Sequence, residues 1–261
     1  MNFTEDKDYF FVKKSVYIRL IILIKHKKDK NMKKIIVALT MLVISTVSSK
    51  ALDASSFSVT AGIAGTQGIF GASATETNRN DSNVISHVKK EHGVFTDGYA
   101  SGFIELNAGD FISIGYEHTP DSITTPTNTT RQDRTVEANV AVDFNDFNTA
   151  YLKLNVPGGL YVKAGYVETD IDVKESMGSG STYNNVSTDG TVVGIGYERS
   201  IADSRIGIRF EGSYLELDDV TSSNGVTATG ATVANSGQNT ITASNLEGLQ
   251  GKVAVTITLG N

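Results

Sequence analysis

The sequence offers few side chains that could perform covalent chemistry. Its 261 residues contain no Cys, which excludes a thiolate nucleophile, a disulfide framework and a thiolate metal site. Three of its four His residues, His87, His92 and His118, follow residue 51. The first two fall in a predicted loop, and no Ser–acid pair stands beside the third. Each is therefore interpreted as a surface or interfacial His.

Two acidic pairs and one glycine-rich stretch are candidates for ligand binding. Asp170 with Asp172, and Asp218 with Asp219, lack the glycine-turned ligand spacing of a calcium loop. The stretch at 178–180 does not lead from a strand into a helix, as a phosphate-binding loop would. We therefore expect no metal, no cofactor and no catalytic residue. The acidic balance of 29 Asp and Glu against 23 Lys and Arg also argues against a nucleic-acid partner.

A second set of charged residues has a regular place in the sequence. Its members lie about four to nine residues from predicted tight turns, so at ~3.3 Å per residue they share similar heights along their strands. Acids and bases are balanced, which favours mutual pairing. The set is Glu105, Glu117, Lys153, Lys163, Glu198, Arg209, Glu211 and Lys252.

The elements that carry these charges alternate with period two, which is the pattern of β-strands. The clearest segment is 252–259, where Val and Ile on one face alternate with Lys and Thr on the other. Residues 52–261 contain no convincing amphipathic helix. The predicted strands are 57–76, 97–108, 111–119, 146–156, 160–172, 190–199, 205–217 and 246–259.

The connections between these eight segments alternate strictly between short and long. Three are tight turns near residues 109, 158 and 202, and four are long, at 77–96, 120–145, 173–189 and 218–245. This layout is typical of a transmembrane barrel with short periplasmic turns and long extracellular loops. Such barrels have an even number of strands, so the alternating residues 135–145 are interpreted as an extension of the fourth strand, bent at Asn145.

The two faces of each strand differ in the same way throughout. One face has uncharged, mostly apolar side chains at four consecutive positions, such as Val253, Val255, Ile257 and Leu259. The other face carries the balanced charges. A Lys or Arg facing lipid at mid-bilayer costs ~2–4 kcal/mol, so the apolar faces should meet lipid and the charges should form a network in the lumen. The prediction is an all-β, eight-stranded, antiparallel up-and-down transmembrane barrel.

The N-terminal part of the chain has a different character. Residues 1–50 hold 11 of the 23 Lys and Arg but only 4 of the 29 acids. Residues 32–51 have the parts of a signal peptide: two Lys, an uncharged apolar run, and a small-x-small site ending at Ala51. We expect export with cleavage near Ala51 and a barrel domain over 52–261. Residues 1–31 are either an over-call of the start or a long n-region.

In layout and patterning, residues 52–261 resemble the small eight-stranded outer-membrane proteins of Gram-negative bacteria: the OmpA transmembrane domain, OmpX and OmpW. One departure is the last strand, which has no aromatic residue where such barrels usually end in one. The resemblance implies residence in the cell outer membrane, with outer-membrane lipid, lipopolysaccharide and the assembly machinery as partners.

Three functions follow as hypotheses from this interpretation. The first is a non-enzymatic structural or narrow porin-like role that passes small solutes through the lumen. The second is a surface-binding or adhesion module that acts through the extracellular loops. The third and weakest is a lipid-modifying enzyme. Because an eight-stranded barrel is barely wider than its own side chains, a filled interior is favoured over an open one.

Overall fold

The computed structural model describes residues 57–79, 82, 84–133, 136–176, 182–202, 204–224 and 238–260. The predicted signal peptide at 32–51, the preceding residues and the glycine-rich stretch at 178–180 lie outside the described residues. In the part of the chain that is described, no helix is long and apolar enough to cross a membrane.

Eight long antiparallel strands form a closed ring, in the order β1-β2-β3-β6-β7-β8-β9-β11 and back to β1. The first and last strands pair in register, with Val59 opposite Leu259, so the ring has no open edge. This confirms the predicted eight-stranded barrel. The ring strands are β1 (Phe57–Arg79), β2 (Ile85–Ala108), β3 (Ile112–Thr119), β6 (Val136–Asn155), β7 (Leu160–Ser176), β8 (Val186–Ser200), β9 (Ile206–Leu217) and β11 (Thr240–Leu259).

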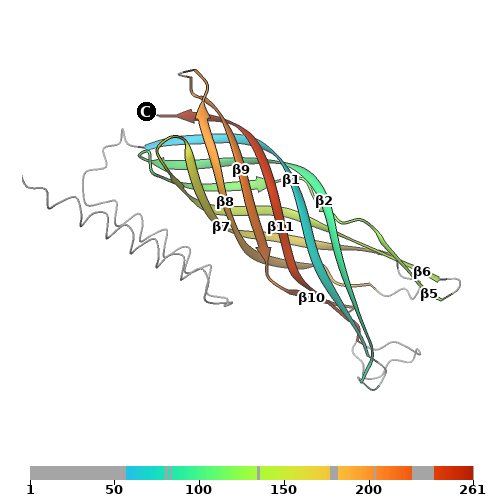
Figure 1. The fold of residues 1–261 in the computed structure, drawn as a ribbon. Helices are drawn as coiled ribbons and strands as arrows, with labels where there is room; N and C mark the ends of the chain where they lie inside the picture. The colour runs from blue at the N-terminus through green and yellow to red at the C-terminus, as the bar shows by residue number, and fades with distance from the viewer. Residues whose placement is uncertain are drawn as a thin grey trace, which may run out of the picture. The chain divides into compact units, whose positions relative to one another are not determined.

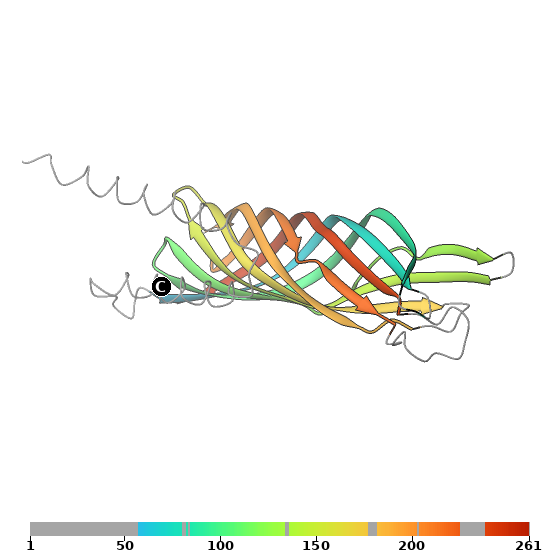
Figure 2. The same ribbon diagram turned by 90° about the horizontal axis from the view of Figure 1, so that it is seen from below.

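Three short strands add to the ring at one end. β4 (Ile123–Thr124) and β5 (Asn128–Asp133) pair with β6, and β10 (Val220–Ser223) pairs with β11. Figures 1 and 2 show that the β1–β2 and β5–β6 ribbons leave the barrel at the end opposite the C-terminus. The short turns lie at the other end. The two ends therefore correspond to the extracellular and periplasmic sides of the prediction.

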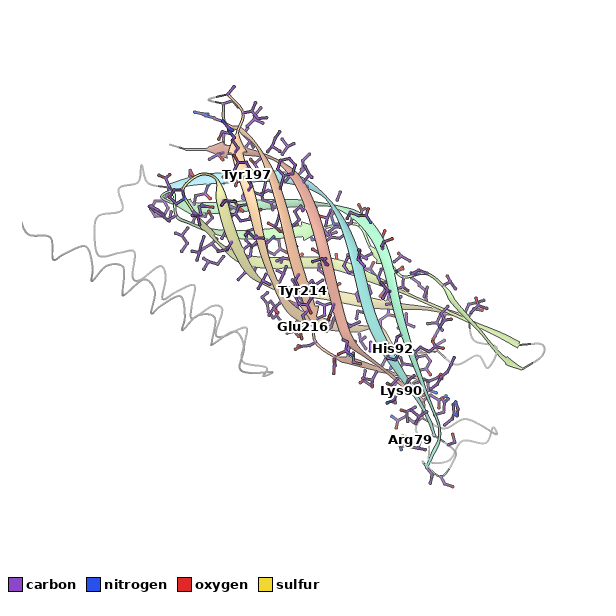
Figure 3. The ribbon with its side chains drawn as sticks, viewed as in Figure 1. Arg79, Lys90, His92, Tyr197, Tyr214 and Glu216 are labelled. Atoms are coloured by element: carbon purple, nitrogen blue, oxygen red, sulfur yellow. The ribbon has the colours of Figure 1, made fainter. Side chains whose placement is uncertain are left out.

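The outer surface of the ring is apolar and exposed. Ile63 is 72% exposed, Ile195 62% and Val253 52%, and none of the predicted outward positions is buried. A continuous apolar belt of this kind suits contact with hydrocarbon rather than water, so the ring is a transmembrane barrel. Tyr197 lies toward the periplasmic end of the belt, whereas Tyr214 and then Glu216 lie toward its extracellular limit (Figure 3).

The extracellular connections are shorter than predicted because the strands continue beyond the membrane. β1 and β2 remain paired as far as Arg79 and Ile85, so most of the predicted loop at 77–96 is a two-stranded ribbon. The predicted loop at 173–189 is likewise shortened by β7 and β8. Pairing in a ribbon satisfies backbone hydrogen-bonding groups that a free loop would leave to water.

Two β-bulges allow long strands to keep their apolar residues inside. On β6 the register shifts between Asn145 and Asn148, and Asp146 has a φ of 49°. The inserted residue reverses the alternation, so Phe144 and Phe147 both contribute to the interior apolar cluster. The interpretation of 135–145 as an extension of the fourth strand is confirmed, with the bend at Asp146. Asn245, with a φ of 53°, has the same role on β11.

Glycines on the inner face make room for aromatic rings from neighbouring strands. A Cβ atom on Gly115 would lie 2.3 Å from Cζ of Tyr151, and one on Gly196 would lie 2.2 Å from Cζ of Tyr161. Each ring thus lies directly over the backbone of the adjacent strand. Glycine at these two positions therefore serves the packing of the lumen.

Candidate functional site: a filled lumen beneath an extracellular cavity

Four of the predicted lumen charges meet near the periplasmic end and form what we call the lower cluster. Arg209 on β9 makes a bidentate contact with Glu105 on β2, at 2.8 Å from Nη1 and 2.7 Å from Nη2. Its Nη2 also donates to Glu198 at 2.8 Å. Lys153 on β6 donates to the same two carboxylates, at 2.7 and 3.0 Å. Each base of the lower cluster therefore contacts both acids.

The other four predicted charges form the upper cluster, nearer the extracellular side. Lys163 lies 2.5 Å from Glu211 and 3.7 Å from Glu117, measured from Nζ to carboxylate oxygen. Lys252 forms an ion pair with Glu117 and lies 3.8 Å from Glu211. The Ser101 hydroxyl donates to Glu117 at 2.7 Å. Here too each base contacts both acids, so both clusters are formally neutral.

These clusters fill the width of the barrel. Arg209 and Glu105 project from opposite walls, because β9 and β2 are separated by two strands in one direction and four in the other. Aromatic rings close the remaining space, with the Arg209 guanidinium 4.6 Å from the Phe103 centroid and Lys163 4.9 Å from the Tyr151 centroid. Of the eight charged residues only Glu198 is not buried, since its side chain is 24% exposed.

An apolar layer covers the upper cluster on its extracellular side. Ile123 from the β4 segment is 1% exposed and packs in one cluster with Phe70, Phe147, Leu215 and Leu217. A space of only about 20 Å³ separates this layer from the charges below, roughly the room of one water molecule. The lumen thus contains, from the periplasm outward, two charge clusters and then an apolar layer.

Above this layer lies a cavity of about 330 Å³, which we call the extracellular cavity. Its walls are the extensions of the strands beyond the apolar belt. Val142 on β6 stands opposite Val173 on β7, and Ala74 on β1 stands opposite Ala243 on β11. Further apolar lining residues include Ala72, Val140, Phe144, Ile171, Val186, Val220, Ile241 and Leu246.

The polar side chains of the extracellular cavity include one ion pair and one further carboxylate, Glu76. Lys89 forms an ion pair with Glu91 at 2.5 Å, and Asn128 donates to the same carboxylate at 2.6 Å. Burial, with help from two nearby carboxylates, raises the pKa of Tyr183 to about 12, so its phenol stays protonated near neutral pH. Burial also raises the pKa of Glu175, the acid whose carboxylate accepts from the Tyr183 backbone N–H. The Lys89–Glu91 pair is neutral in itself, and most of the remaining lining is apolar.

Sequence reasoning missed the extracellular cavity because much of its wall falls in segments predicted as long connections. Val140, Val142, Val173 and Val186 all belong to those segments. The signal was present, since 135–145 alternates visibly, but the two bulges conceal which residues face inward. A second cavity, of about 540 Å³, opens at the periplasmic end and reaches Lys153 and Glu198. It is polar and lined largely by the short turns.

The remaining residues that the sequence singled out have ordinary partners. His118 Nδ1 lies 2.8 Å from Asn148 Oδ1, which also accepts from the Tyr116 hydroxyl. Asp170 accepts from Ser187 at 2.7 Å, and Asp172 accepts from Asn145 at 2.9 Å. Among the described residues, no group of three or more His, Cys, Asp and Glu is placed to hold a metal ion.

Comparison with known proteins finds solved structures with a similar fold. No family model matches the chain, and no curated protein matches its sequence. It is similar to the outer membrane protein OprG from Pseudomonas aeruginosa, with 11% identity and a TM-score of 0.47 over 77% of this chain and 97% of that one. It is also similar to the outer membrane protease OmpT from Escherichia coli, with 11% identity and a TM-score of 0.39 over 77% and 97%. The attachment invasion locus protein Ail of Yersinia pestis is 8% identical, with a TM-score of 0.32 over 75% and 99%.

Proposed function

We propose that this chain is an integral outer-membrane protein whose lumen is closed to solutes and whose extracellular cavity binds a small, uncharged, apolar molecule. One observation carries the proposal: a largely apolar cavity of about 330 Å³ lies above a barrel interior filled by paired charges. Cavities that take small molecules are concave, mostly apolar and about 300–1,000 Å³ in volume, with a few polar groups that fix orientation.

The small side chains in the wall are what leave the cavity open. Ala74 and Ala243 face each other across the β1–β11 seam, where larger apolar residues would fill the space. Thr75 is the next residue on β1 and is not part of the lining, although it belongs to the same ribbon. Substitution at Ala74 should therefore close the cavity, whereas the same substitution at Thr75 should leave it unchanged.

The test is a titration of methyl-labelled protein in lipid nanodiscs with naphthalene, followed by NMR. Saturable shifts are expected at the methyl groups of Val142 and Val173, and Ala74→Phe should weaken binding at least tenfold. Thr75→Phe is the matched control and should bind like the parent protein. Partition of naphthalene into lipid would instead shift the NMR signals of the lipid-facing Val253 methyl groups, and would do so equally in every variant. An absence of saturable shifts at the cavity methyls would refute the proposal.

A second candidate function is surface recognition by the β1–β2 ribbon. Its tip exposes three apolar side chains to water, with Val84 59%, Ile85 52% and Val88 46% exposed. Exposed apolar residues that gather at one place often mark an interaction site. Cells that display Ile85→Ser with Val88→Ser should then attach less well to a hydrophobic surface than cells that display Ser86→Ala. If cells with the two variants attach equally well, the β1–β2 ribbon does not act in surface recognition.

A further inference from the structure

The extension of β1 and β2 beyond the membrane brings a Ser and a His together. Ser73 on β1 and His92 on β2 are register partners, and the Ser73 hydroxyl oxygen lies 2.8 Å from His92 Nδ1. From the sequence, His92 belonged to a predicted loop and was interpreted as a surface or interfacial His. In the structure it lies along the ribbon with Lys90 and Arg79, on the extracellular side (Figure 3).

The β11 bulge supplies a third group on the other side of Ser73. Asn245, the residue with the left-handed backbone conformation, places its side-chain amide nitrogen 3.5 Å from the Ser73 hydroxyl oxygen. β-Bulges often redirect a side chain next to an active site. Ser73 therefore lies between an imidazole on β2 and an amide donor on β11, in a row across three neighbouring strands.

The surroundings of Ser73 open toward the upper edge of the lipid-facing belt. Gly71, two residues before it, has no side chain, and a Cβ atom there would meet only the Gly93 carbonyl oxygen, at 4.0 Å. Beyond this notch the exposed apolar side chains are Ile69 at 51%, Leu249 at 62% and Val94 at 77%. An acyl chain could lie along these residues and bring its ester group to Ser73.

We propose that Ser73 and His92 form a nucleophile–base pair that hydrolyses carboxylic esters of amphiphilic molecules at the extracellular edge of the membrane. With the proton of His92 on Nε2, Nδ1 can accept the Ser73 proton as the hydroxyl oxygen attacks the ester carbonyl carbon. The Asn245 amide donates to the resulting oxyanion. Ser73 and His92 also belong to the lining of the extracellular cavity, but the reaction needs only these side chains, Asn245 and water, and does not depend on a ligand bound there.

The remaining steps balance with water as the only co-reactant. The ester C–O bond breaks, the leaving alkoxide takes the proton from His92, and the acyl group stays on Ser73. A water molecule then attacks the acyl carbon while His92 accepts its proton. The carboxylic acid leaves as the Ser73 oxygen regains that proton. The sum is ester plus water giving acid plus alcohol, with no redox change.

The primary test is covalent labelling of the folded full chain in detergent micelles with a fluorophosphonate, followed by peptide mapping. Label is expected on Ser73 and not on Ser244, which is the register partner of Ser73 on β11 and has the same type of side chain. His92→Ala should abolish labelling while the protein keeps its heat-modifiable gel migration. Equal labelling of Ser73 and Ser244, or none above the Ser73→Ala background, would overturn the proposal.

Hydrolysis of p-nitrophenyl octanoate in mixed micelles provides a second measurement. Loss of the general base typically lowers a rate by ~10²–10⁴-fold, so Ser73→Ala and His92→Ala should each lose at least about 100-fold. Ser244→Ala should hydrolyse like the parent, and Asn245→Ala should slow the reaction with less effect on KM than on kcat. Hydrolysis that survives in Ser73→Ala would place the activity elsewhere.

Discussion

Arg209 illustrates what a buried charge requires of its neighbours. Its guanidinium is held by two carboxylates from two other strands and lies against an aromatic ring. A buried ion pair gains little net stability, because desolvation offsets the attraction, but an unpaired buried charge is strongly destabilising. The clusters therefore select one strand register rather than add much stability, since any other register would leave buried charges unpaired.

Removal of one partner from the lower cluster should therefore be costly. We expect Arg209→Ala to lower the free energy of unfolding by about 3–5 kcal/mol, because it leaves two carboxylates, Glu105 and Glu198, with Lys153 as their one remaining base in the lower cluster. Urea unfolding in lipid vesicles measures this change. Arg199, an exposed residue near the periplasmic end of β8, is the control, and Arg199→Ala should change stability by less than ~1 kcal/mol. Equal losses would contradict the lumen assignment.

The packed lumen also requires glycine at certain positions on the inner face of the strands. In Gly115→Ala the new methyl group would overlap the Tyr151 ring, whose hydroxyl donates to Glu105 at 2.9 Å. We expect a loss of about 1–3 kcal/mol from overpacking, measured by the same unfolding transition. Gly65→Ala on the outer face meets no atom within 4 Å and should leave stability unchanged or slightly raised. If Gly115→Ala leaves the free energy of unfolding unchanged, the Tyr151 ring can move aside without cost.

At the scale of the strand, the bulges explain what sequence could and could not predict. Alternation located all eight ring strands and assigned the inner and outer faces within the membrane. Alternation did not assign the faces on the extracellular side of Asp146 and Asn245. At each bulge one inserted residue reverses the alternation, and no residue type in the sequence marks the place. The same reversal concealed the cavity lining on β6. The pairing of Ser73 with His92 was missed for a related reason, since His92 falls in a predicted loop, which has no register that could place it beside Ser73.

The conformation at Asp146 gives a prediction for the bulge itself. A left-handed backbone costs a non-glycine residue ~1–2 kcal/mol, and Asp and Asn tolerate it better than β-branched residues do. Asp146→Gly should therefore retain or increase stability, and Asp146→Val should be less stable than Asp146→Gly by about 1–2 kcal/mol. The difference can be measured by urea unfolding of both variants in the same vesicles. If Val and Gly behave alike, the bulge is not anchored at this residue.

On the scale of the whole molecule, the layered lumen predicts electrical silence. Two neutral charge clusters and an apolar layer lie between the periplasmic cavity and the extracellular one, so a planar bilayer containing folded protein should show no steady conductance. Folded protein is recognised by a difference in gel migration between boiled and unboiled samples. Small, steady, cation-favouring steps would instead support the porin-like hypothesis, and would require the clusters to separate.

The sequence positions of the paired residues also govern how the barrel can enter the membrane. Glu105 and Arg209 are 104 residues apart, and Val59 pairs with Leu259, so the first contact requires the chain as far as β9 and the second requires β11 as well. A half-built ring would expose unpaired charges and free strand edges to hydrocarbon, both of which are very unfavourable there. Insertion should therefore be cooperative, with strands joining as a set, and a chain truncated before β11 should accumulate outside the bilayer.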